Sequence, residues 1–347
     1  DISFNSNKLG EEAQKNELLK DLLEDFAKDT LNLRPSRIGK LDIIGNAYEY
    51  LIKQFAADSG RKAGEFYTPP EVSELMARLV DPKEGDEICD PTCGSGSLLM
   101  KCGRLIQQRF NKSKKYALYG QESIGSTWAL AKMNMFLHGI EPHIRLGDTI
   151  YEPAAPERFD VVLTNPPFGT KGANQAPERD DFTISTSNKQ LNFVQHVLTI
   201  LKPGGRAAVV LPDNVLFADQ AGEVMKLLAE DCDLHTVLRL PRGTFTPYSQ
   251  GVKANVIFFT KGYPTENVWI YDARTNVPGI TKKDRPLTKE HFAEFVKCYG
   301  ADPNGKSKRK AGDSKDDRWR SFHVTEVAAR EVKLDGFKWL KEESLED

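Results

Sequence analysis

The sequence predicts an α/β fold, built on a mostly parallel, seven-stranded β-sheet with helices on both faces. From about residue 86 onward, short apolar runs alternate with amphipathic helical segments, which is typical of parallel sheets. Runs such as VVL and AAVVL are apolar on successive residues, as in strands buried on both faces. Pro203-Gly204-Gly205 ends the helical segment 189–201 before the next run begins.

Two helical segments precede the sheet and form a predicted lead-in over residues 1–60. Residues 11–32 place apolar side chains on one helical stripe, namely Leu18, Leu19, Leu22, Leu23 and Phe26. Residues 41–57 repeat this pattern with Ile43, Ile44, Tyr48, Leu51, Ile52 and Phe55. We therefore expect two short amphipathic helices before the sheet.

The main α/β domain is predicted over residues 61–300. Its apolar runs predict strands at 88–89, 116–119, 143–146, 159–164, 206–211, 235–240 and 252–260. Helical periodicity predicts helices over 126–138, 189–201 and 219–231. Residues 169–189 are polar, rich in Gly, Asn and Ser, and too long for an ordinary connector, so they predict a functional or mobile loop.

Two segments follow this domain. Residues 301–318 carry the run KSKRK and predict a charged linker; contact with phosphate is the alternative reading of that run. Residues 319–347 form a C-terminal tail with several aromatic side chains, which must pack either on a partner or on their own domain.

Composition narrows the class of protein. The 347 residues carry 48 Lys and Arg against 50 Asp and Glu, a net charge of −2, so any DNA binding would need a local basic patch or a partner subunit. No apolar run approaches the ~18 residues of a membrane span, and no signal-peptide pattern opens the chain. The five cysteines have neither paired nor metal-binding spacing, which fits reduced thiols in a cytoplasm and no metal site.

Four consecutive predicted strands end in polar residues, namely Asp90, Glu122, Asp148 and Asn165. In open α/β sheets the ligand lies beyond the carboxyl ends of the strands. We therefore expect these four side chains to surround one ligand.

The first three strand ends fit a nucleoside ligand, although each has a simpler alternative. Gly94 and Gly96 in DPTCGSGS permit a sharp turn and close approach of a ligand, but the third glycine of a dinucleotide motif is missing. Glu122 is placed to accept hydrogen bonds from ribose hydroxyls, and Asp148 from an adenine amino group. The alternatives are a βα turn without a ligand and two helix caps.

The fourth strand end, Asn165-Pro166-Pro167-Phe168, suggests chemistry at an amino group. The two prolines hold the backbone extended. The side-chain oxygen of Asn165 and the carbonyl of Pro166 can then both accept from one –NH2 group, while Phe168 offers a face on which a ring can stack. Two acceptors draw the nitrogen toward tetrahedral geometry and localise its lone pair, which makes a poor nucleophile reactive.

These motifs resemble a known family. The order GEFYTPP (64–70), DPTCGSGS (90–97), GQES (120–123), GDT (147–149) and NPPF (165–168) is similar to that of S-adenosylmethionine-dependent N6-adenine DNA methyltransferases. Within them, the chain resembles the modification subunit of type I restriction–modification systems. That resemblance extends over IGNAYEYLI (44–52), LPDNVLF (211–217), LRLPRGTF (238–245) and SQGVKANVIFFTKG (249–262).

The resemblance implies a Rossmann-like methyltransferase fold and a role for each motif. The segment that closes over the methionine end of the cofactor would be Glu65, Phe66, Tyr67, Thr68, Pro69 and Pro70. The loop around its amino-acid moiety would be Asp90, Gly94, Ser95, Gly96 and Ser97. Glu122 would bind the ribose and Asp148 the adenine. The catalytic segment would be Asn165, Pro166, Pro167 and Phe168, with Asn165 also next to the cofactor, and the target adenine would be flipped out of the duplex.

The resemblance further implies partners: double-stranded DNA, a specificity subunit and a restriction subunit. It implies direct methyl transfer without a metal. Proteins of this type carry a larger helical domain before the GEFYTPP-like segment, so we expect further chain before Asp1, of which residues 1–60 would be a remnant. Two alternatives remain from the residues themselves: a methyltransferase for a protein glutamine amide or RNA adenine, and a non-catalytic methyltransferase-like scaffold.

Overall fold

The computed structural model describes residues 11–32, 37, 43–58, 67–153, 158–169, 176–216, 220–247, 249, 251–314, 316–331 and 337–341. The chain divides into two compact units, residues 1–48 and 49–347. The first unit contains α1 (Glu12–Ala27) and the 3-10 helix η2 (Asp29–Leu31), within the predicted segment 11–32. The apolar stripe of α1 is exposed, including Leu23 and Phe26. The second predicted helix is α3 (Ile43–Asp58), which runs across the division.

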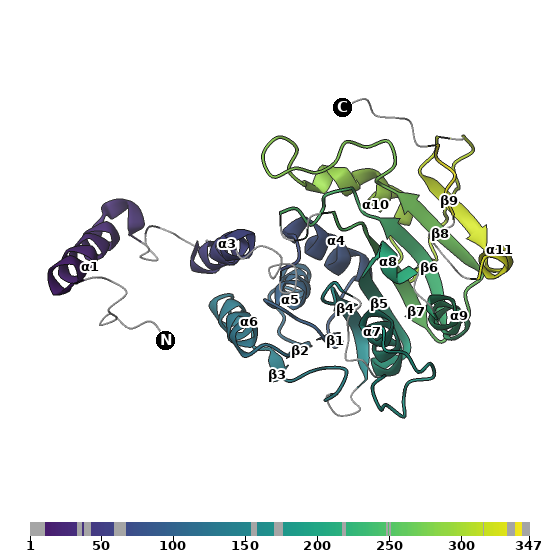
Figure 1. Cartoon of the computed structure of the whole chain (residues 1–347), viewed down its shortest axis with the longest axis horizontal. Helices are drawn as coiled ribbons and strands as arrows, with labels where there is room; N and C mark the ends of the chain where they lie inside the picture. Colours follow the sequence, from purple (N-terminus) through teal and green to yellow (C-terminus); the bar gives the residue numbers. More distant parts are fainter. Residues whose placement is uncertain are drawn as a thin grey trace. The chain divides into compact units, whose positions relative to one another are not determined.

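The larger unit is built on one mixed β-sheet with helices on both faces (Figure 1). Its strands are β1 (Glu87–Asp90), β2 (Ala117–Glu122), β3 (His143–Leu146), β4 (Phe159–Thr164), β5 (Leu201–Pro212), β6 (Cys232–Arg239), β7 (Ala254–Lys261), β8 (Asn267–Asp272) and β9 (Trp319–His323). Its helices after α3 are α4 (Pro70–Val80), α5 (Ser97–Arg109), α6 (Gly125–Leu137), α7 (Lys189–Ile200), α8 (Asp213–Leu216), α9 (Ala221–Asp231), the 3-10 helix η4 (Lys289–Phe292), α10 (Ala293–Tyr299) and α11 (Val324–Ala329).

The sheet is larger than predicted. Among the described residues it has nine strands rather than seven, in the order β3-β2-β1-β4-β5-β7-β6-β8-β9. The seven predicted strands are all present, and β8 and β9 extend the sheet beyond β6. The pairs from β3 to β5 are parallel, as expected, whereas β7 is antiparallel to both of its neighbours, β5 and β6.

Side chains of the central strands alternate between two hydrophobic cores. Val161 points into the core formed with α4, α5, α6 and α10, and its neighbour Val162 points into the core formed with α7, α9 and α11. Ile88 and Cys89 on β1 alternate in the same way. Both cores need apolar side chains from these strands, which is why the sequence shows continuous apolar runs instead of simple alternation.

The structure differs from the predicted division after residue 300. The segment expected to be a charged linker is packed against the sheet: Lys306 Nζ donates to Asp233 Oδ2 at 2.7 Å, and Arg309 NH1 donates to Thr236 Oγ1 at 2.9 Å. The tail contributes β9, which pairs with β8, and Trp319 is buried. Two of the cationic side chains of the segment therefore bind groups on β6. Of the helices described, none is long and apolar enough to cross a membrane.

Candidate active site

The predicted site lies at the topological switch point of the sheet. β1 lies between β2 and β4, and it is parallel to both. From β1 the chain moves outward to β2 and β3 and later returns to the other side as β4, which leaves a crevice between the carboxyl ends of β1 and β4. Asp90 ends β1, and Asn165 directly follows β4. The structure therefore brings these two predicted residues to the same edge of the sheet.

Asp90 ties the two strand ends together. Its Oδ1 accepts from the hydroxyl of Thr164 at 2.8 Å and from the backbone N–H of Thr92 at 3.0 Å. The side chain is only 1% exposed. Burial raises the pKa of Asp90 to about 7, although the two hydrogen bonds favour its charged form. Near neutral pH this carboxyl therefore exchanges a proton.

This titration predicts how stability depends on pH. The pKa of Asp90 is about 7 in the folded chain and about 3.8 in the unfolded one. The folded state therefore holds the extra proton between these values, and its free energy of unfolding falls as pH rises through that window. Asp90→Asn keeps the acceptor oxygen but removes the titration. Between pH 5 and pH 8 the wild type loses about 3 kcal/mol of stability through Asp90, because the loss continues over about two pH units, up to the folded pKa, at about 1.4 kcal/mol each. We therefore expect Asp90→Asn to gain about 3 kcal/mol relative to the wild type over this range.

The measurement is urea unfolding of both proteins at the two pH values. The difference between them isolates Asp90 from other buried groups, such as His196, whose pKa is lowered to about 3 by burial. A gap that stays constant with pH would show that Asp90 does not titrate in this range.

The glycine loop connects β1 to α5 and is held by Glu122. Gly94 and Gly96 have φ angles of 54° and 77°, a left-handed conformation that favours glycine. Glu122 Oε2 accepts from the N–H of Gly94 at 3.1 Å, and its Oε1 accepts from the N–H of Ile124 at 2.8 Å. Burial raises the pKa of Glu122, while these backbone hydrogen bonds oppose the rise. The backbone N–H and the side chain of Ser123 also hydrogen-bond to this carboxylate and lower its pKa.

A cavity of about 190 Å³ opens beside Glu122. Segments at or after all four predicted strand ends line it, through Thr92, Glu122, Asp148 and Pro167. Lys189 and Phe193 of α7 complete one wall. Asp148 is half-buried, and its Oδ1 accepts from the N–H of Ile150 at 2.9 Å, so it also caps the turn that follows.

The serines of the glycine loop are engaged elsewhere. The carbonyl of Ser95 accepts from Asn134 Nδ2 at 3.0 Å, and the hydroxyl of Ser97 lies 3.3 Å from that of Ser73. Described residues 94–97 do not line the cavity beside Glu122. The loop therefore shapes the site through its backbone, whereas the carboxylates line it.

Asn165 presents a buried acceptor. Its Nδ2 donates to the hydroxyl of Thr68 at 3.1 Å, which orients the amide. Its Oδ1 is buried and has no hydrogen-bond partner among the residues that the structure describes. An unsatisfied buried polar group costs about 1–3 kcal/mol, so such a group calls for an explanation. A ligand with an –NH donor would satisfy this oxygen.

The rest of the NPPF segment is fixed by neighbours from distant parts of the chain. Pro166 is buried. The carbonyl of Pro167 accepts from the side chain of Gln190 on α7. The ring of Phe168 meets the fully buried ring of Phe245 edge-on, with centroids 5.0 Å apart. These contacts hold the segment in one conformation.

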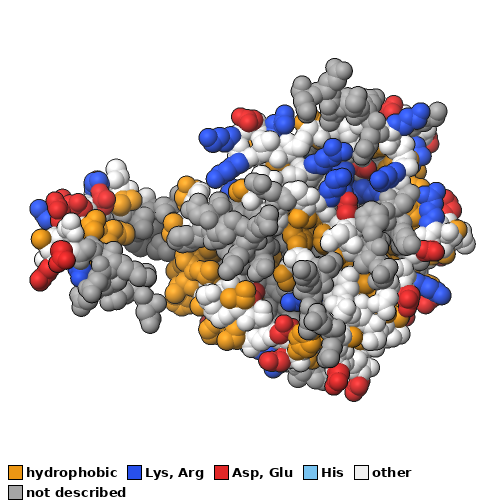
Figure 2. Space-filling view, viewed as in Figure 1, with side chains coloured by type: hydrophobic (Ala, Val, Ile, Leu, Met, Phe, Trp, Pro, Cys, Tyr) orange, Lys and Arg blue, Asp and Glu red, His pale blue; other side chains and the backbone are white. Residues whose placement is uncertain are grey.

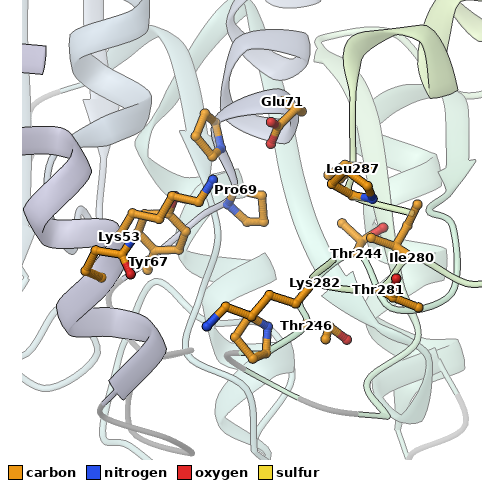
Figure 3. A pocket seen from close by; sticks show the side chains of 14 residues that line it. Lys53, Tyr67, Pro69, Glu71, Thr244, Thr246, Ile280, Thr281, Lys282 and Leu287 are labelled. Atoms are coloured by element: carbon orange, nitrogen blue, oxygen red, sulfur yellow. The ribbon is translucent and has the colours of Figure 1, made fainter. Parts of the chain in front are cut away.

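The predicted segment 65–70 is only partly described. Glu65 and Phe66 lie outside the described residues. Thr68 contacts Asn165, whereas its neighbours Tyr67 and Pro69, with Pro70, line a separate cavity of about 100 Å³ with Thr244 and Lys282 (Figure 3). Alternation along an extended backbone explains this division, because successive side chains point to opposite sides.

Sequence reasoning missed several residues that hold the site together. Thr164 binds Asp90, Gln190 binds Pro167, and Phe245 packs on Phe168. The contact of the predicted residue Thr68 with Asn165 was not foreseen either. Each is far from its partner in the chain: Thr164 and Asp90, for example, are 74 positions apart. Only the presence of Thr68 and Phe245 in the motifs GEFYTPP and LRLPRGTF pointed to them.

Comparison with known proteins agrees with this geometry. A family model described as N-6 DNA methylase matches residues 39–347. The chain belongs to the N-6 DNA methylase family. This family match confirms the resemblance seen in the order of the motifs.

Two curated relatives and one solved structure carry related names. The chain is 38% identical over 320 residues to the type I restriction enzyme EcoKI methylase subunit of Escherichia coli K12. The match covers 84% of this chain and 58% of that protein. The chain is also 38% identical over 300 residues to the StySPI methylase subunit of Salmonella potsdam, covering 78% and 56%. The chain thus spans well under two thirds of either relative.

The solved structure is the type I restriction-modification system methyltransferase subunit from Streptococcus thermophilus. It matches with a TM-score of 0.76 at 29% identity, over 96% of this chain and 70% of that one. The predicted methyltransferase fold is therefore confirmed, with nine described strands in place of seven.

Proposed function

We propose that this chain transfers a methyl group from S-adenosylmethionine to the N6 amino group of a flipped-out adenine in DNA, as the modification subunit of a type I restriction–modification complex. One observation carries the proposal: the buried Oδ1 of Asn165, at the switch point of the sheet, has no hydrogen-bond partner in the described part of the chain. The family, and the relatives named as type I methylase subunits, support DNA as the substrate over a protein amide or RNA.

The chemistry follows from the position of Asn165. Its Oδ1 accepts one hydrogen of the amino group, and the carbonyl of Pro166 accepts the other. Both hydrogens are then held, so the nitrogen leaves the plane of the ring and its lone pair becomes available for attack. Thr68 fixes the amide of Asn165 through its 3.1 Å hydrogen bond, so the acceptor is oriented before the substrate arrives.

The residues beside the crevice fit the cofactor. S-adenosylmethionine supplies an activated methyl group on a sulfonium. Glu122 lines the cavity, where its carboxylate would accept from ribose hydroxyls, and Asp148 lines the same cavity, where it would accept from an adenine amino group. The glycine backbone held by Glu122 borders the amino-acid end, next to Asp90.

The proposed partners follow from the relatives' names. A separate specificity subunit would choose the DNA sequence, and a restriction subunit would join for cleavage. This fits the net charge of −2, because this chain would contact only the DNA around the flipped base.

Direct measurement of the product tests the proposed function. The protein, assembled with its specificity subunit, is incubated with labelled S-adenosylmethionine and DNA from cells that lack the system. We expect label in N6-methyladenine after digestion to nucleosides. Label in protein or RNA and none in DNA would reject the proposed substrate.

Phe168→Ala is expected to weaken binding of the flipped base by about 1–3 kcal/mol, the usual contribution of base–aromatic stacking. Phe168→Tyr is the matched control, since it keeps the aromatic face and the contact with Phe245. The measurement is the fluorescence of 2-aminopurine at the target position, which rises when the base leaves the stack. Equal fluorescence and equal methylation by both variants would show that Phe168 does not stack on the base.

A further inference from the structure

A second, larger cavity lies on the other side of the NPPF segment. Its volume is about 640 Å³, and Phe168 and Gly169 form part of its lining. Pro167, by contrast, lines the smaller cavity beside Glu122. The catalytic segment therefore separates two cavities, only one of which the proposed cofactor uses.

The lining of this second cavity is strongly basic. It contains five cationic side chains, Arg239, Arg242, Lys253, Arg274 and Lys338, but only two carboxylates, Asp213 and Asp272. Its net charge of +3 contrasts with −2 for the whole chain. Figure 2 shows Lys and Arg side chains gathered in the upper part of the larger unit in this view. This cavity is thus a local basic patch in an otherwise balanced protein.

Each of the two carboxylates already interacts with one arginine of the lining. Asp213 Oδ2 accepts from Arg274 NH1 at 2.6 Å, and Asp272 Oδ2 lies 3.4 Å from Arg239 NH1. Burial opposes ionisation of Asp272, but hydrogen bonds from the backbone N–H groups of Thr275 and Arg274 lower its pKa overall. These buried pairs form a rigid floor, and they do not neutralise the lysines at the rim.

Lys253 and Lys338 are the cations at that rim. Both are exposed, and in the described part of the chain neither has an ion-pair partner. The backbone carbonyl of Lys253 accepts from the N–H of Asp213 at 2.8 Å, which fixes the start of β7 against α8.

Lys338 is held by the aromatic residues on each side of it. Phe337 is buried, and its ring centroid lies 4.5 Å from that of Phe322. Trp339 Nε1 donates to the carbonyl of Asp317 at 2.7 Å. The tail is thereby anchored on its own domain, and its lysine is positioned at the cavity.

We propose that this basic cavity binds backbone phosphates of the DNA strand that carries the target adenine, with Lys253 and Lys338 as the contacting cations. The inference rests on the proposed function. A nucleotide that rotates out of a duplex carries its flanking phosphates with it, so they must be held near the segment that receives the base. Phe168 lies at this cavity, and lysines contact phosphates as point charges.

The test measures the salt dependence of DNA binding. The protein is assembled with its specificity subunit and titrated onto a labelled duplex at several KCl concentrations. The duplex contains the motif that the enzyme methylates, in its unmethylated form. Each phosphate contact with duplex DNA contributes about 0.9 to the slope of log K against log salt. We expect Lys253→Ala/Lys338→Ala to reduce that slope by about 1.8 and therefore to weaken binding by roughly 60-fold near 0.1 M salt, relative to 1 M salt where the electrostatic contribution vanishes.

Matched controls separate this inference from the proposed function. Lys226→Ala removes an exposed lysine of α9 outside the cavity and should leave the slope unchanged. Lys253→Arg/Lys338→Arg keeps both charges and should restore it. Absence of N6-methyladenine from wild-type reactions would reject the proposed function. Wild-type methylation with a double-alanine slope equal to that of Lys226→Ala would overturn the phosphate site, as would weaker assembly with the specificity subunit at an unchanged slope.

Discussion

Asn165→Ala is expected to reduce methyl transfer by at least about 10²–10³-fold, the usual loss when a preorganised hydrogen-bonding group is removed from an active site. The variant lacks the oxygen that accepts from the amino group, so the nitrogen stays planar and unreactive. Affinity for S-adenosylmethionine should remain nearly unchanged, because Glu122 and Asp148 are intact. Single-turnover methylation and calorimetric titration with the cofactor measure the two effects separately.

Thr68 provides a matched pair of variants for this prediction. Thr68→Ser keeps the hydroxyl that accepts the hydrogen bond from Asn165 Nδ2, and this variant should retain most of the activity. Thr68→Val removes it, so the amide of Asn165 loses its orientation and the rate should fall while cofactor affinity persists. If Asn165→Ala abolished cofactor binding instead, or methylated at the wild-type rate, Asn165 would not hold the amino group.

Glu122→Ala is expected to weaken the affinity for S-adenosylmethionine by about a hundredfold, since hydrogen bonds to a charged group are each worth about 1.5–3 kcal/mol. The change removes the proposed ribose acceptor and also the partner of the Gly94 N–H, so the glycine loop loses its support. Glu122→Gln retains one acceptor oxygen and should fall between the alanine variant and the wild type. Calorimetric titration with the cofactor measures all three proteins.

The thermal unfolding of these variants serves as the control. The alanine variant leaves the N–H groups of Gly94 and Ile124 without their acceptor, so its melting temperature should drop modestly while unfolding remains cooperative. An alanine variant that unfolds cooperatively and binds the cofactor as tightly as the wild type would show that Glu122 is not the ribose ligand.

The sequence predicted which residues would lie together at the candidate site because they follow strand ends. Asp90, Glu122 and Asn165 each end or follow a strand, and parallel strands bring such residues to one edge whatever the details of packing. The contacts that orient them could not be read in the same way. Thr68 and Asn165 are 97 positions apart, and their hydrogen bond depends on where α4 packs.

The last two strands were missed for a related reason. β8 is six residues long with half-buried and buried positions, and β9 pairs with it across a long separation in sequence. Local periodicity carries little information about such pairs. The segment 301–318 was misleading because its composition is that of a solvated linker, whereas Lys306 meets the largely buried Asp233. Such pairing is visible only in three dimensions.

The central claim is adenine methylation in DNA by the Asn165 segment. It is tested most directly by a genome-wide map of N6-methyladenine in cells that carry the intact gene or its Asn165→Ala version. We expect one bipartite methylated motif with the intact gene and its complete loss in the variant. Identical maps, with both proteins expressed and binding S-adenosylmethionine, would contradict it.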